Sequence, residues 1–548
     1  MKNYPYYPVK RYDTFDKMVA AMQEFGEKEA FAWYDRKENR SSITYTQLYS
    51  TVNNLKKRLA ASGLGGKNCR LAVVSENSVE WIIAFLAATA MGGVAVCVDI
   101  EQPDETIREL IRQADSTLVV ASPTFLDICA PLLEKGDIKA LYSTTERGRG
   151  QYTSIYTLAE QGEALSEPEL QPIDRDDTAA IVFTSGTTSR SKPVMLTQNN
   201  ILQNASSSMA MVEHGYNIFS SLPFFHSYGL SCAVINTMIK GATLTLNGDL
   251  RTMMRDLRLA APESILAVPL VAEGVYTMLW AILEKVGQDE KVRKLLKLNR
   301  TFSKIGLPIG RSKLIEVKNK VLGPLRVLIC GGAHLDPELI RNLQAFGITV
   351  VQGYGITECS PLISVNRNKA NKVGTIGLPV PNCEVKLVEG EIWVKGENVM
   401  KGYYNDPEAT AEAFEGEWFK TGDLGSIDSS GFISITGRIK NLIVLKNGKK
   451  ISPEKLEELI GRIPLVKDVL VYGTSSGAST DDVKPAASIY PDPAKTQNMT
   501  SYEILEQLQN EVNKINATLP VYQQVQMINI REKEFDKTSS RKIKRYTN

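Results

Sequence analysis

The chain has 548 residues, of which 43% are hydrophobic and 23% are charged, a composition typical of a folded protein with ample core. Lysine and arginine together exceed aspartate and glutamate by only 2, so the net charge does not indicate a nucleic-acid partner or a charged membrane surface. The 3 histidines and 7 scattered cysteines, with no C-x-x-C pair and no signal peptide, argue against a zinc site, a histidine-driven triad and disulfides, and favour a reduced, cytoplasmic protein.

One segment tests whether the chain crosses a membrane. Residues 81–98 carry no charge over a length at the lower limit for a membrane-spanning helix. The pair Gly92-Gly93 interrupts this run. We therefore predict a buried helix over Trp81–Met91, a short strand over Val94–Val98, and no transmembrane segment.

The first part of the chain alternates between strand and helix patterns. Residues up to about Arg40 have the mixed composition of a surface arm, and apolar residues at helical spacing follow from Thr46. Strands are predicted at Leu71–Val74 and Leu118–Val120, and Asp104 is expected to cap a helix that ends at Ala114. This alternation predicts βαβ units and a parallel sheet.

A loop rich in hydroxyl groups follows the apolar run Ala179–Phe183, which we predict to be a buried strand. The loop begins at Thr184 and reaches a cation at Lys192; between them lie Ser185, Gly186, Thr187 and Thr188. Hydroxyls and backbone N–H groups of such a loop can surround a polyphosphate, with the lysine as a point charge. The alternative is a solvated hairpin turn, and the spacing excludes a Walker phosphate loop.

The middle of the chain predicts a second α/β unit. A helix is expected from about Asn199, and a run of aromatic residues then carries His226. The basic stretch 283–320 is predicted to be mostly helical, and we interpret its charges as a solvated face. A strand that begins at Leu325 ends in Gly331, Gly332 and Ala333, and Asp336-Pro337 is expected to start a helix.

A second motif, Tyr354-Gly355-Ile356-Thr357-Glu358, directly follows the strand predicted at Ile348–Val351. Open α/β sheets bind their ligands at the carboxyl ends of strands. At such a position the tyrosine can stack on a base, Thr357 can donate to a phosphate, and Glu358 can hold Mg²⁺ through a hard oxygen. The alternative interpretation is a turn with a helix-capping glutamate.

Two further motifs lie toward the C-terminus. Residues 374–435 have the short alternating strands of a small barrel, which contains Asp423 after an aromatic strand, and Arg438 follows in Gly437-Arg438-Ile439-Lys440-Asn441. Past Lys440 the pattern is that of a compact α+β domain. The last motif, residues 536–545, is strongly basic and includes Lys542; alone, it is typical of a disordered arm that binds RNA or lipid.

Taken together, the order and separations of these four motifs resemble those of the adenylate-forming enzymes across nearly the whole chain. The phosphate motif of that family is usually T-S-G-T-T-G-x-P-K-G, and here Ser189, Ser191 and Pro193 stand for its second glycine, its proline and its last glycine. These departures restrict the backbone but keep the phosphate ligands. Arg541 and Asn441 also replace a usual glycine and aspartate.

The resemblance implies roles for individual residues and the cosubstrates ATP, Mg²⁺ and coenzyme A. Lys542, Thr184, Lys192 and His226 would be catalytic, and Glu358 would hold the metal. The cofactor-binding set would be Ser185, Gly186, Thr187, Thr188, Gly331, Gly332, Ala333, Tyr354, Gly355, Thr357, Asp423, Arg438, Lys440 and Gly448. By this resemblance Lys440 is the hinge, and Lys542 enters the site for adenylation.

We therefore predict an α/β protein with an N-terminal domain, residues 1–438, and a mobile α+β C-terminal domain, residues 439–548. The larger domain would contain parallel-sheet subdomains and a small barrel. The predicted function is a fatty acid–CoA ligase, because the segments Leu222–His226, Glu358–Asn366 and Lys446–Pro453 resemble bacterial long-chain acyl-CoA synthetases. The alternatives are a ligase that loads a separate phosphopantetheinyl carrier protein, and a catalytically inactive nucleotide-binding homologue. The expected location is cytoplasmic, with peripheral membrane contact as an option.

Overall fold

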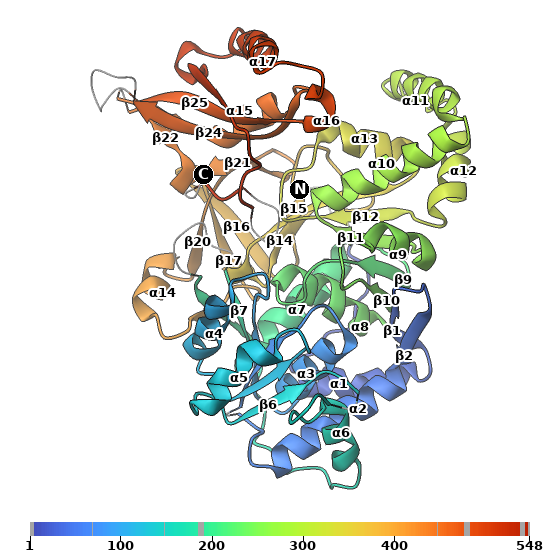
Figure 1. Cartoon of the computed structure of the whole chain (residues 1–548), viewed down its shortest axis with the longest axis vertical. Coiled ribbons are helices and arrows are strands. Elements are labelled where there is room, and N and C mark those ends of the chain that lie inside the picture. Colours follow the sequence, from blue (N-terminus) through green and yellow to red (C-terminus); the bar gives the residue numbers. More distant parts are fainter. Residues whose placement is uncertain are drawn as a thin grey trace.

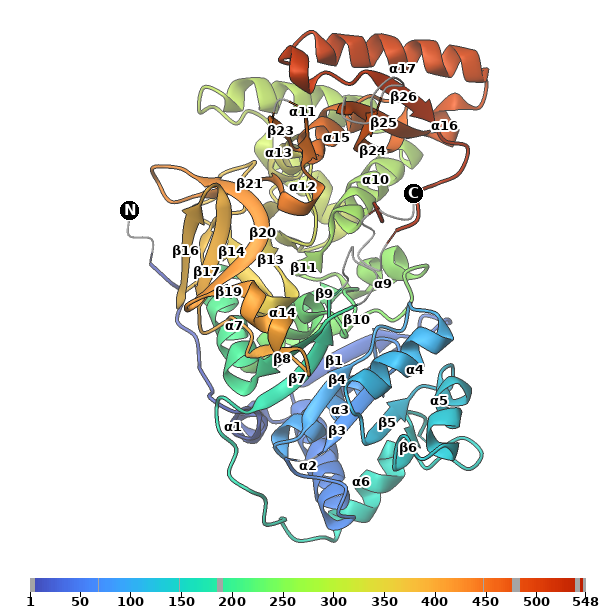
Figure 2. The same cartoon turned by 90° about the vertical axis from the view of Figure 1, so that its left-hand side faces the viewer.

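Two α/β sheets, an antiparallel sheet and a C-terminal α+β unit make up the molecule (Figures 1 and 2). The structure is a computed structural model that describes residues 5–67, 69–146, 148–184, 191–446, 448–475, 483–537 and 543–545. The C-terminal elements lie at the top of Figure 1, and the first α/β unit lies at the bottom.

The first α/β sheet has seven described strands, and its pairings are parallel except at β8. Its strands, in spatial order, are β18 (Gly402–Tyr403), β8 (Pro193–Thr197), β7 (Thr178–Phe183), β4 (Val94–Cys97), β3 (Arg70–Val74), β5 (Leu118–Ala121) and β6 (Ala140–Ser143). The predicted alternation of strands and helices is confirmed here, and helix α3 (Val79–Ala90) is buried over nearly its whole surface. Asp104 is the first residue of its helix rather than the cap, which is Pro103.

The second α/β sheet has nine described strands, and the six in its middle are parallel. In spatial order they are β15 (Leu378–Pro379), β14 (Leu362–Val365), β13 (Thr349–Gly355), β12 (Val327–Cys330), β11 (Ser264–Ala267), β9 (Asn217–Ser220), β10 (Thr243–Leu246), β1 (Glu29–Tyr34) and β2 (Arg40–Thr44). The carboxyl ends of the parallel strands lie at a common edge of the sheet. The second motif, which begins at Tyr354, was predicted to follow such a strand end, and it does so at the end of β13.

The prediction of a surface arm up to Arg40 is wrong. Strand β1 joins the second sheet between β10 and the edge strand β2, and a short helix precedes it. Phe15 and Phe31 are fully buried, and the ring of Phe15 packs edge-on against Phe85 at a centroid distance of 5.5 Å. The charged residues between them stay at the surface, so the mixed composition hid a helix with one buried face and a strand of the second sheet.

The strands predicted to form a small barrel lie in an antiparallel sheet. They are β16 (Cys383–Val388), β17 (Glu391–Gly396), β19 (Phe414–Glu415), β20 (Trp418–Ile427) and β21 (Ile433–Arg438). Strand β20 pairs with β17, β19 and β21 along its ten residues. Backbone hydrogen bonds between Ile433 of β21 and the residues Ile376 and Gly377 just before β15 also connect this sheet to the end of the second α/β sheet.

The C-terminal residues build a separate small core. Strands β24 (Val466–Ser475) and β25 (Val483–Pro491) are antiparallel, β26 (Met527–Ile530) pairs parallel with β25, and β22 (Ile443–Val444) pairs with β23 (Lys450–Ile451). A hydrophobic cluster of this unit, which includes Leu456, Ile460, Leu508 and Val512, is distinct from the clusters of the α/β sheets.

Helices surround the sheets, and α11 and α12 project at the right of Figure 1. The basic stretch is helical as predicted, with a break between these two helices. The described α-helices are α1 (Phe15–Ala21), α2 (Tyr45–Ala61), α3, α4 (Asp104–Gln113), α5 (Leu126–Glu134), α6 (Ile155–Glu163), α7 (Gln198–Met211), α8 (Asn236–Lys240), α9 (Met253–Ala260), α10 (Pro269–Lys285), α11 (Asp289–Ser303), α12 (Arg311–Leu322), α13 (Pro337–Ala345), α14 (Pro407–Ala413), α15 (Pro453–Gly461), α16 (Pro493–Thr496) and α17 (Ser501–Asn516). Within the described ranges, none of them combines the length and the apolar character that spanning a membrane requires.

Helix α7 is unusual because it is rich in polar residues and yet buried along its entire length. Its amide side chains bond to the backbone of surrounding elements. Gln198 donates to the carbonyl of Thr89, and Asn200 donates to the carbonyls of Glu397 and Val399. These bonds satisfy a carbonyl near the end of helix α3 and two carbonyls of the segment after β17, and a buried polar group left without a partner costs about 1–3 kcal/mol.

Asn204 of the same helix holds the loop that follows β13. Its amide nitrogen donates to the carbonyl oxygens of Leu362 at 2.8 Å and of Cys359 at 3.3 Å, and its amide oxygen accepts from the Leu362 N–H at 3.1 Å. One buried side chain therefore fixes both ends of the segment 359–362, which directly follows Glu358.

We expect Asn204→Leu to lower the free energy of unfolding by about 2–4 kcal/mol, because it keeps the side-chain size but leaves buried backbone groups without partners. Urea unfolding followed by tryptophan fluorescence measures this change. Asn199→Leu on the same helix is the control, because the Asn199 amide oxygen is buried without a partner among the described residues. Equal losses for the two variants would contradict the assigned role of Asn204.

Candidate functional site

The described parts of all four sequence motifs reach one cavity, which has a volume of about 970 Å³. It lies at the carboxyl ends of strands from both α/β sheets, where open sheets of this kind bind ligands. The residues from the motifs that line it include Thr184, Lys192, Tyr354, Gly355, Ile356, Thr357, Glu358, Thr421, Gly422, Arg438, Ile439, Lys440, Asn441 and Ile543.

The first motif is the connection of a β-hairpin. Strands β7 and β8 are antiparallel, with Phe183 opposite Pro193. The Thr184 N–H donates to the Lys192 carbonyl at 3.0 Å, and the Lys192 N–H donates to Thr184 Oγ1 at 3.1 Å, so both residues are fixed at the base of the loop. The predicted phosphate ligands Ser185, Gly186, Thr187 and Thr188 lie outside the described residues.

The Lys192 ammonium lies 4.5 Å from the centre of the Tyr403 ring, which belongs to the short strand β18 beside β8. The hydroxyl of the same tyrosine donates to Glu358 Oε1 at 2.9 Å. Tyr403 thus connects the predicted phosphate-binding lysine to the predicted metal-binding carboxylate. It contacts the lysine through a cation–π interaction and the carboxylate through a hydrogen bond.

Burial raises the pKa of the Glu358 carboxyl, and the nearby cations of Arg438 and Lys192 only partly oppose this shift. A carboxylate in this environment gains from a bound cation. Among the described residues there is no cluster of three or more potential metal ligands. A single carboxylate, that of Glu358, fits Mg²⁺ bound together with substrate phosphates, because Mg²⁺ in such sites commonly binds only one or two protein carboxylates.

Tyr354, Asp423 and Arg438 form a compact polar group beside this carboxylate. The Tyr354 hydroxyl donates to Asp423 Oδ2 at 2.6 Å, and Arg438 Nε donates to Asp423 Oδ1 at 2.5 Å. Asp423 and Arg438 are opposite each other on β20 and β21. Burial and the neighbouring Asp423 carboxylate raise the pKa of the Tyr354 hydroxyl well above its usual value, so this hydroxyl remains a donor at neutral pH.

The glycines after β12 also lie at the cavity. Gly331 and Gly332 line it, whereas Ala333 is exposed and is not among the lining residues. A Cβ added to Gly331 would lie 3.3 Å from the Tyr228 ring, which is closer than most such contacts. A glycine at this position therefore keeps the strand end flat and open toward the cavity.

The aromatic segment after β9 lines the cavity. His226 lies on the wall, and its ring is 4.6 Å from that of Phe225. We call the buried lining residues Ser208, Val212, His214, Cys232, Asn236 and Leu266 the inner part of the cavity. We call the lining residues Glu76, Asn77, Asn247, Gly248, Leu250 and Arg251 the outer wall.

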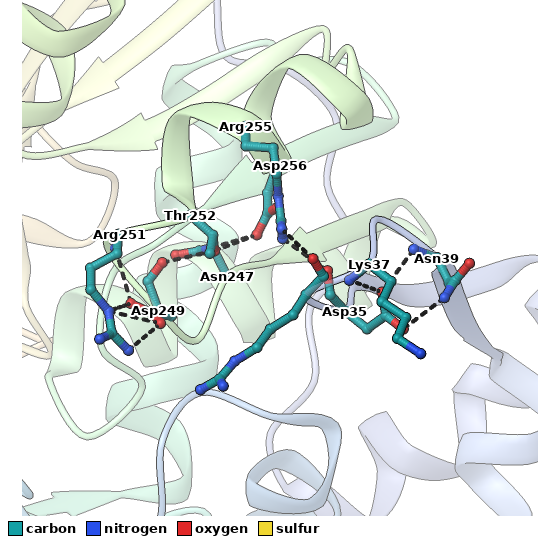
Figure 3. A network of polar contacts seen from close by, with 10 residues as sticks. Asp35, Lys37, Asn39, Asn247, Asp249, Arg251, Thr252, Arg255 and Asp256 are labelled. Carbon is teal, nitrogen blue, oxygen red and sulfur yellow. Dashed lines mark hydrogen bonds and ion pairs between the residues drawn. The ribbon is translucent and has the colours of Figure 1, made fainter.

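A polar network holds the outer wall in place (Figure 3). Asn247 donates to Asp256 Oδ2 at 2.7 Å and to Thr252 Oγ1 at 3.0 Å. Arg255 bonds to the same carboxylate and to the carbonyl of Asp35, so the network reaches the turn between β1 and β2. The N-terminal hairpin, predicted to be a surface arm, therefore supports a wall of the cavity.

The C-terminal tail also reaches the cavity. Ile543 lines it, and the Arg545 guanidinium donates to Glu457 at 2.6 Å and to the carbonyl of Val471 at 3.1 Å. Lys542 itself lies outside the described residues. Lys440 is exposed at the cavity rim, whereas Gly448 lies in the turn between β22 and β23, away from the lining.

Known protein families match both the larger N-terminal part and the C-terminal part of this chain. A family model described as AMP-binding enzyme matches residues 18–404, and a model of the AMP-binding enzyme C-terminal domain matches residues 440–547. A long-chain-fatty-acid–CoA ligase of Mycobacterium bovis is 28% identical over 429 residues, which cover 74% of this chain and 71% of that protein. A chloroplastic long-chain-fatty-acid–[acyl-carrier-protein] ligase of Arabidopsis thaliana is 27% identical, over 85% of this chain and 75% of that protein.

Among solved structures, the o-succinylbenzoate coenzyme A synthetase of Bacillus subtilis in complex with ATP and a magnesium ion matches with a TM-score of 0.74. The match has 22% sequence identity and covers 96% of this chain and 98% of that chain. The fold is therefore that of the adenylate-forming enzymes. The chain itself belongs to the AMP-binding enzyme family, because the family model covers well over half of it.

The structure also places residues at the site that the sequence did not indicate. Tyr403 and Tyr228 lie beside the predicted ligands, and Glu391 accepts a hydrogen bond from the Gly422 N–H at 2.8 Å, which holds the turn before Asp423. No local pattern marked these residues. The pairing of β18 with β8 brings Tyr403 to the cavity, the pairing of β17 with β20 brings Glu391 there, and Tyr228 begins the π-helix that follows His226.

We expect Glu358→Gln to reduce adenylate formation by roughly 10²-fold or more while leaving the nucleotide-free protein at least as stable as the parent at pH 7. The folded-state pKa of this carboxyl is raised, so its ionisation costs stability above that pKa, and the cost disappears as the pH falls to the usual value of 4.5. The stability gain of the variant should therefore shrink toward that pH.

Thermal unfolding across pH and pyrophosphate exchange measure the two effects. Glu412→Gln is the control, because it removes an exposed carboxylate from the same cavity. A large loss of stability with normal activity per folded molecule would instead identify Glu358 as a structural cap.

Proposed function

We propose that this protein is an AMP-forming acyl-CoA ligase that activates a medium- or long-chain fatty acid. ATP and the acid would give an acyl adenylate and pyrophosphate, and coenzyme A would then give the acyl-CoA and AMP. The observation that carries the proposal is the cavity where the described parts of the four motifs meet, with His226 on its wall. The fatty-acid ligases among the relatives support the choice of acid.

The contacts at the cavity support a role for each residue. Asp423 and Arg438 would hold the ribose hydroxyls, Tyr354 would stack on the base above Gly331 and Gly332, and Thr357 would bond to the α-phosphate. Thr184 and Lys192 would hold the phosphates from the base of the hairpin. Glu358 would bind Mg²⁺, which supplies positive charge to the phosphates during the displacement.

The first half-reaction is a displacement at phosphorus. A carboxylate oxygen of the acid attacks the α-phosphorus, a new P–O bond forms, and the bond to the pyrophosphate oxygen breaks. Negative charge gathers on the α-phosphoryl oxygens, and the cations of Lys192 and Arg438 reduce its cost in a partly dehydrated cavity. Lys542 would bridge the acid and the α-phosphate, because the neighbouring Ile543 lies at the cavity.

In the second half-reaction the thiol sulfur attacks the carbonyl carbon of the adenylate. The thiol loses its proton, the C–O bond to AMP breaks, and a C–S bond forms. Lys542 would have to leave before the thiol can approach the same carbonyl. We therefore assign residues 439–548 to a domain that moves about Lys440, which lies at the rim just after β21.

A carrier-protein ligase remains a second candidate, and a relative of that activity supports it. The two candidates share the adenylation step and differ only in the thiol. The deciding test is a thioester assay with a panel of acids, in which either coenzyme A or a phosphopantetheinyl carrier protein is supplied. Failure of every acid to support pyrophosphate exchange would favour the inactive homologue.

We expect Lys542→Ala to reduce adenylate formation by roughly 10²–10³-fold while a supplied acyl adenylate is still converted to acyl-CoA. The reason is that the lysine would stabilise charge only in the first step. Exchange of pyrophosphate into ATP measures the first half-reaction, and thioester formation from synthetic adenylate measures the second. Lys544→Ala is the control two residues along the tail, and equal loss of both halves would contradict the assignment.

A further inference from the structure

The inner part of the cavity runs between a sheet and two helices. Leu266 of β11, Gly353 of β13 and Val365 of β14 contribute the sheet side, and α7 and the π-helix Tyr228–Ile235 contribute the other side. His226 follows the carboxyl end of β9, whereas His214 precedes the amino end of the same strand. The strand itself spans about 10 Å, so these two histidines lie toward opposite ends of the inner part.

Near His226 the lining contains the apolar residues Leu222, Phe225 and Leu362 together with Ser221 and Ser227, whereas the end near His214 is mostly polar. At the other end Ser208, His214 and Asn236 line the cavity, and their exposures are 8%, 4% and 4%. An aliphatic tail of a fatty acid would thus pass apolar walls and meet polar side chains at its end.

The polar end has a defined hydrogen-bond order. Ser208 Oγ donates to the Ala205 carbonyl at 2.7 Å, so it accepts from the Asn236 amide nitrogen at 2.8 Å. The Asn236 amide oxygen lies 2.8 Å from His214 Nε2, which must therefore carry the proton. Burial and the nearby Lys240 cation lower the pKa of His214 to about 4, so the ring is neutral at pH 7.

One N–H group at the polar end has no hydrogen-bond partner among the described residues. An asparagine amide nitrogen carries two N–H groups, and within the described residues the Asn236 nitrogen has only the bond to Ser208. A methyl group placed against a buried, unpaired N–H leaves that donor without a partner, whereas a hydrogen-bond acceptor in the same place satisfies it. Sites that are built to bond a polar group of the substrate reject analogues that lack it.

We propose that the acid activated by this enzyme carries a neutral hydrogen-bond acceptor, a ketone or a hydroxyl, at the end remote from its carboxyl group. Asn236 donates to that group and is the residue that determines this specificity, with Ser208 and His214 fixing the orientation of its amide. The inference rests on the proposed acyl-CoA ligase function and narrows its substrate class. A tail-end carboxylate is disfavoured, because the polar end presents a neutral ring and a neutral amide, and the Lys240 ammonium is directed at the carbonyls of His214 and Gly215.

The test compares acids in matched pairs of equal chain length, one ending in a methyl group and the other in a ketone or hydroxyl, from short to long chains. Thioester formation gives kcat/KM for each acid, and acids with a carboxylate at that end form a third arm. We expect the parent to prefer the ketone or hydroxyl acid by about tenfold or more at the best length. In Asn236→Leu the preference should vanish, with the methyl-ended acid retained or improved.

Two further variants keep the result interpretable. Asn236→Ser keeps a small polar residue where α8 faces α7, and it should lose most of the preference for an acid with a polar end. This variant replaces Asn236→Leu in the test if Asn236→Leu does not fold. Val212→Ala widens the same part of the cavity and should change the preferred length but not the preference for a polar end. Equal or better use of methyl-ended acids by the parent overturns the inference but leaves the ligase function intact. Absence of turnover with every acid overturns the ligase function and the inference with it.

Discussion

The burial of helix α7 is the constraint on which the rest of the large domain depends. A helix with this many amides and hydroxyls is expected at a surface, yet each of its residues is buried. Its side chains instead donate to a carbonyl of helix α3, to the segment that follows β17 in the antiparallel sheet, and to the segment that follows β13. Because a buried donor without a partner is costly, the three sheets can adopt only an arrangement that satisfies this helix.

This arrangement explains how an uncharged interior can hold a charged site. The Glu358 carboxylate is shielded from water and lies near the cations of Lys192 and Arg438. The Tyr403 hydroxyl donates a hydrogen bond to it. In a medium of low effective dielectric these fixed groups act on phosphate charge more strongly than water-exposed ones. The positions of these groups come from strand pairings far apart in the sequence, so the site is a property of the assembled sheets.

Much of the fold followed from local pattern, and the failures have physical causes. The βαβ alternation around α3 was predicted because a buried helix and parallel strands have continuous apolar runs. The N-terminal arm was misjudged because Phe15 and Phe31 gain their burial only from contact with distant elements. Likewise Tyr403, Tyr228 and Asn236 carry no local signal, whereas Tyr354, Glu358 and Arg438 lie in motifs whose spacing is itself informative.

Three residues at regular spacing along α7 act on three different parts of this enzyme. Asn200 supports the antiparallel sheet, Asn204 holds the loop next to Glu358, and Ser208 lines the inner end of the cavity. These residues are one helical turn apart, about 6 Å each, on one face of the helix. An insertion or deletion between these residues would rotate one of them away from the face that the others share. Divergence of the acid pocket among descendants of this sequence should therefore proceed by substitution of wall residues, with the length of α7 unchanged.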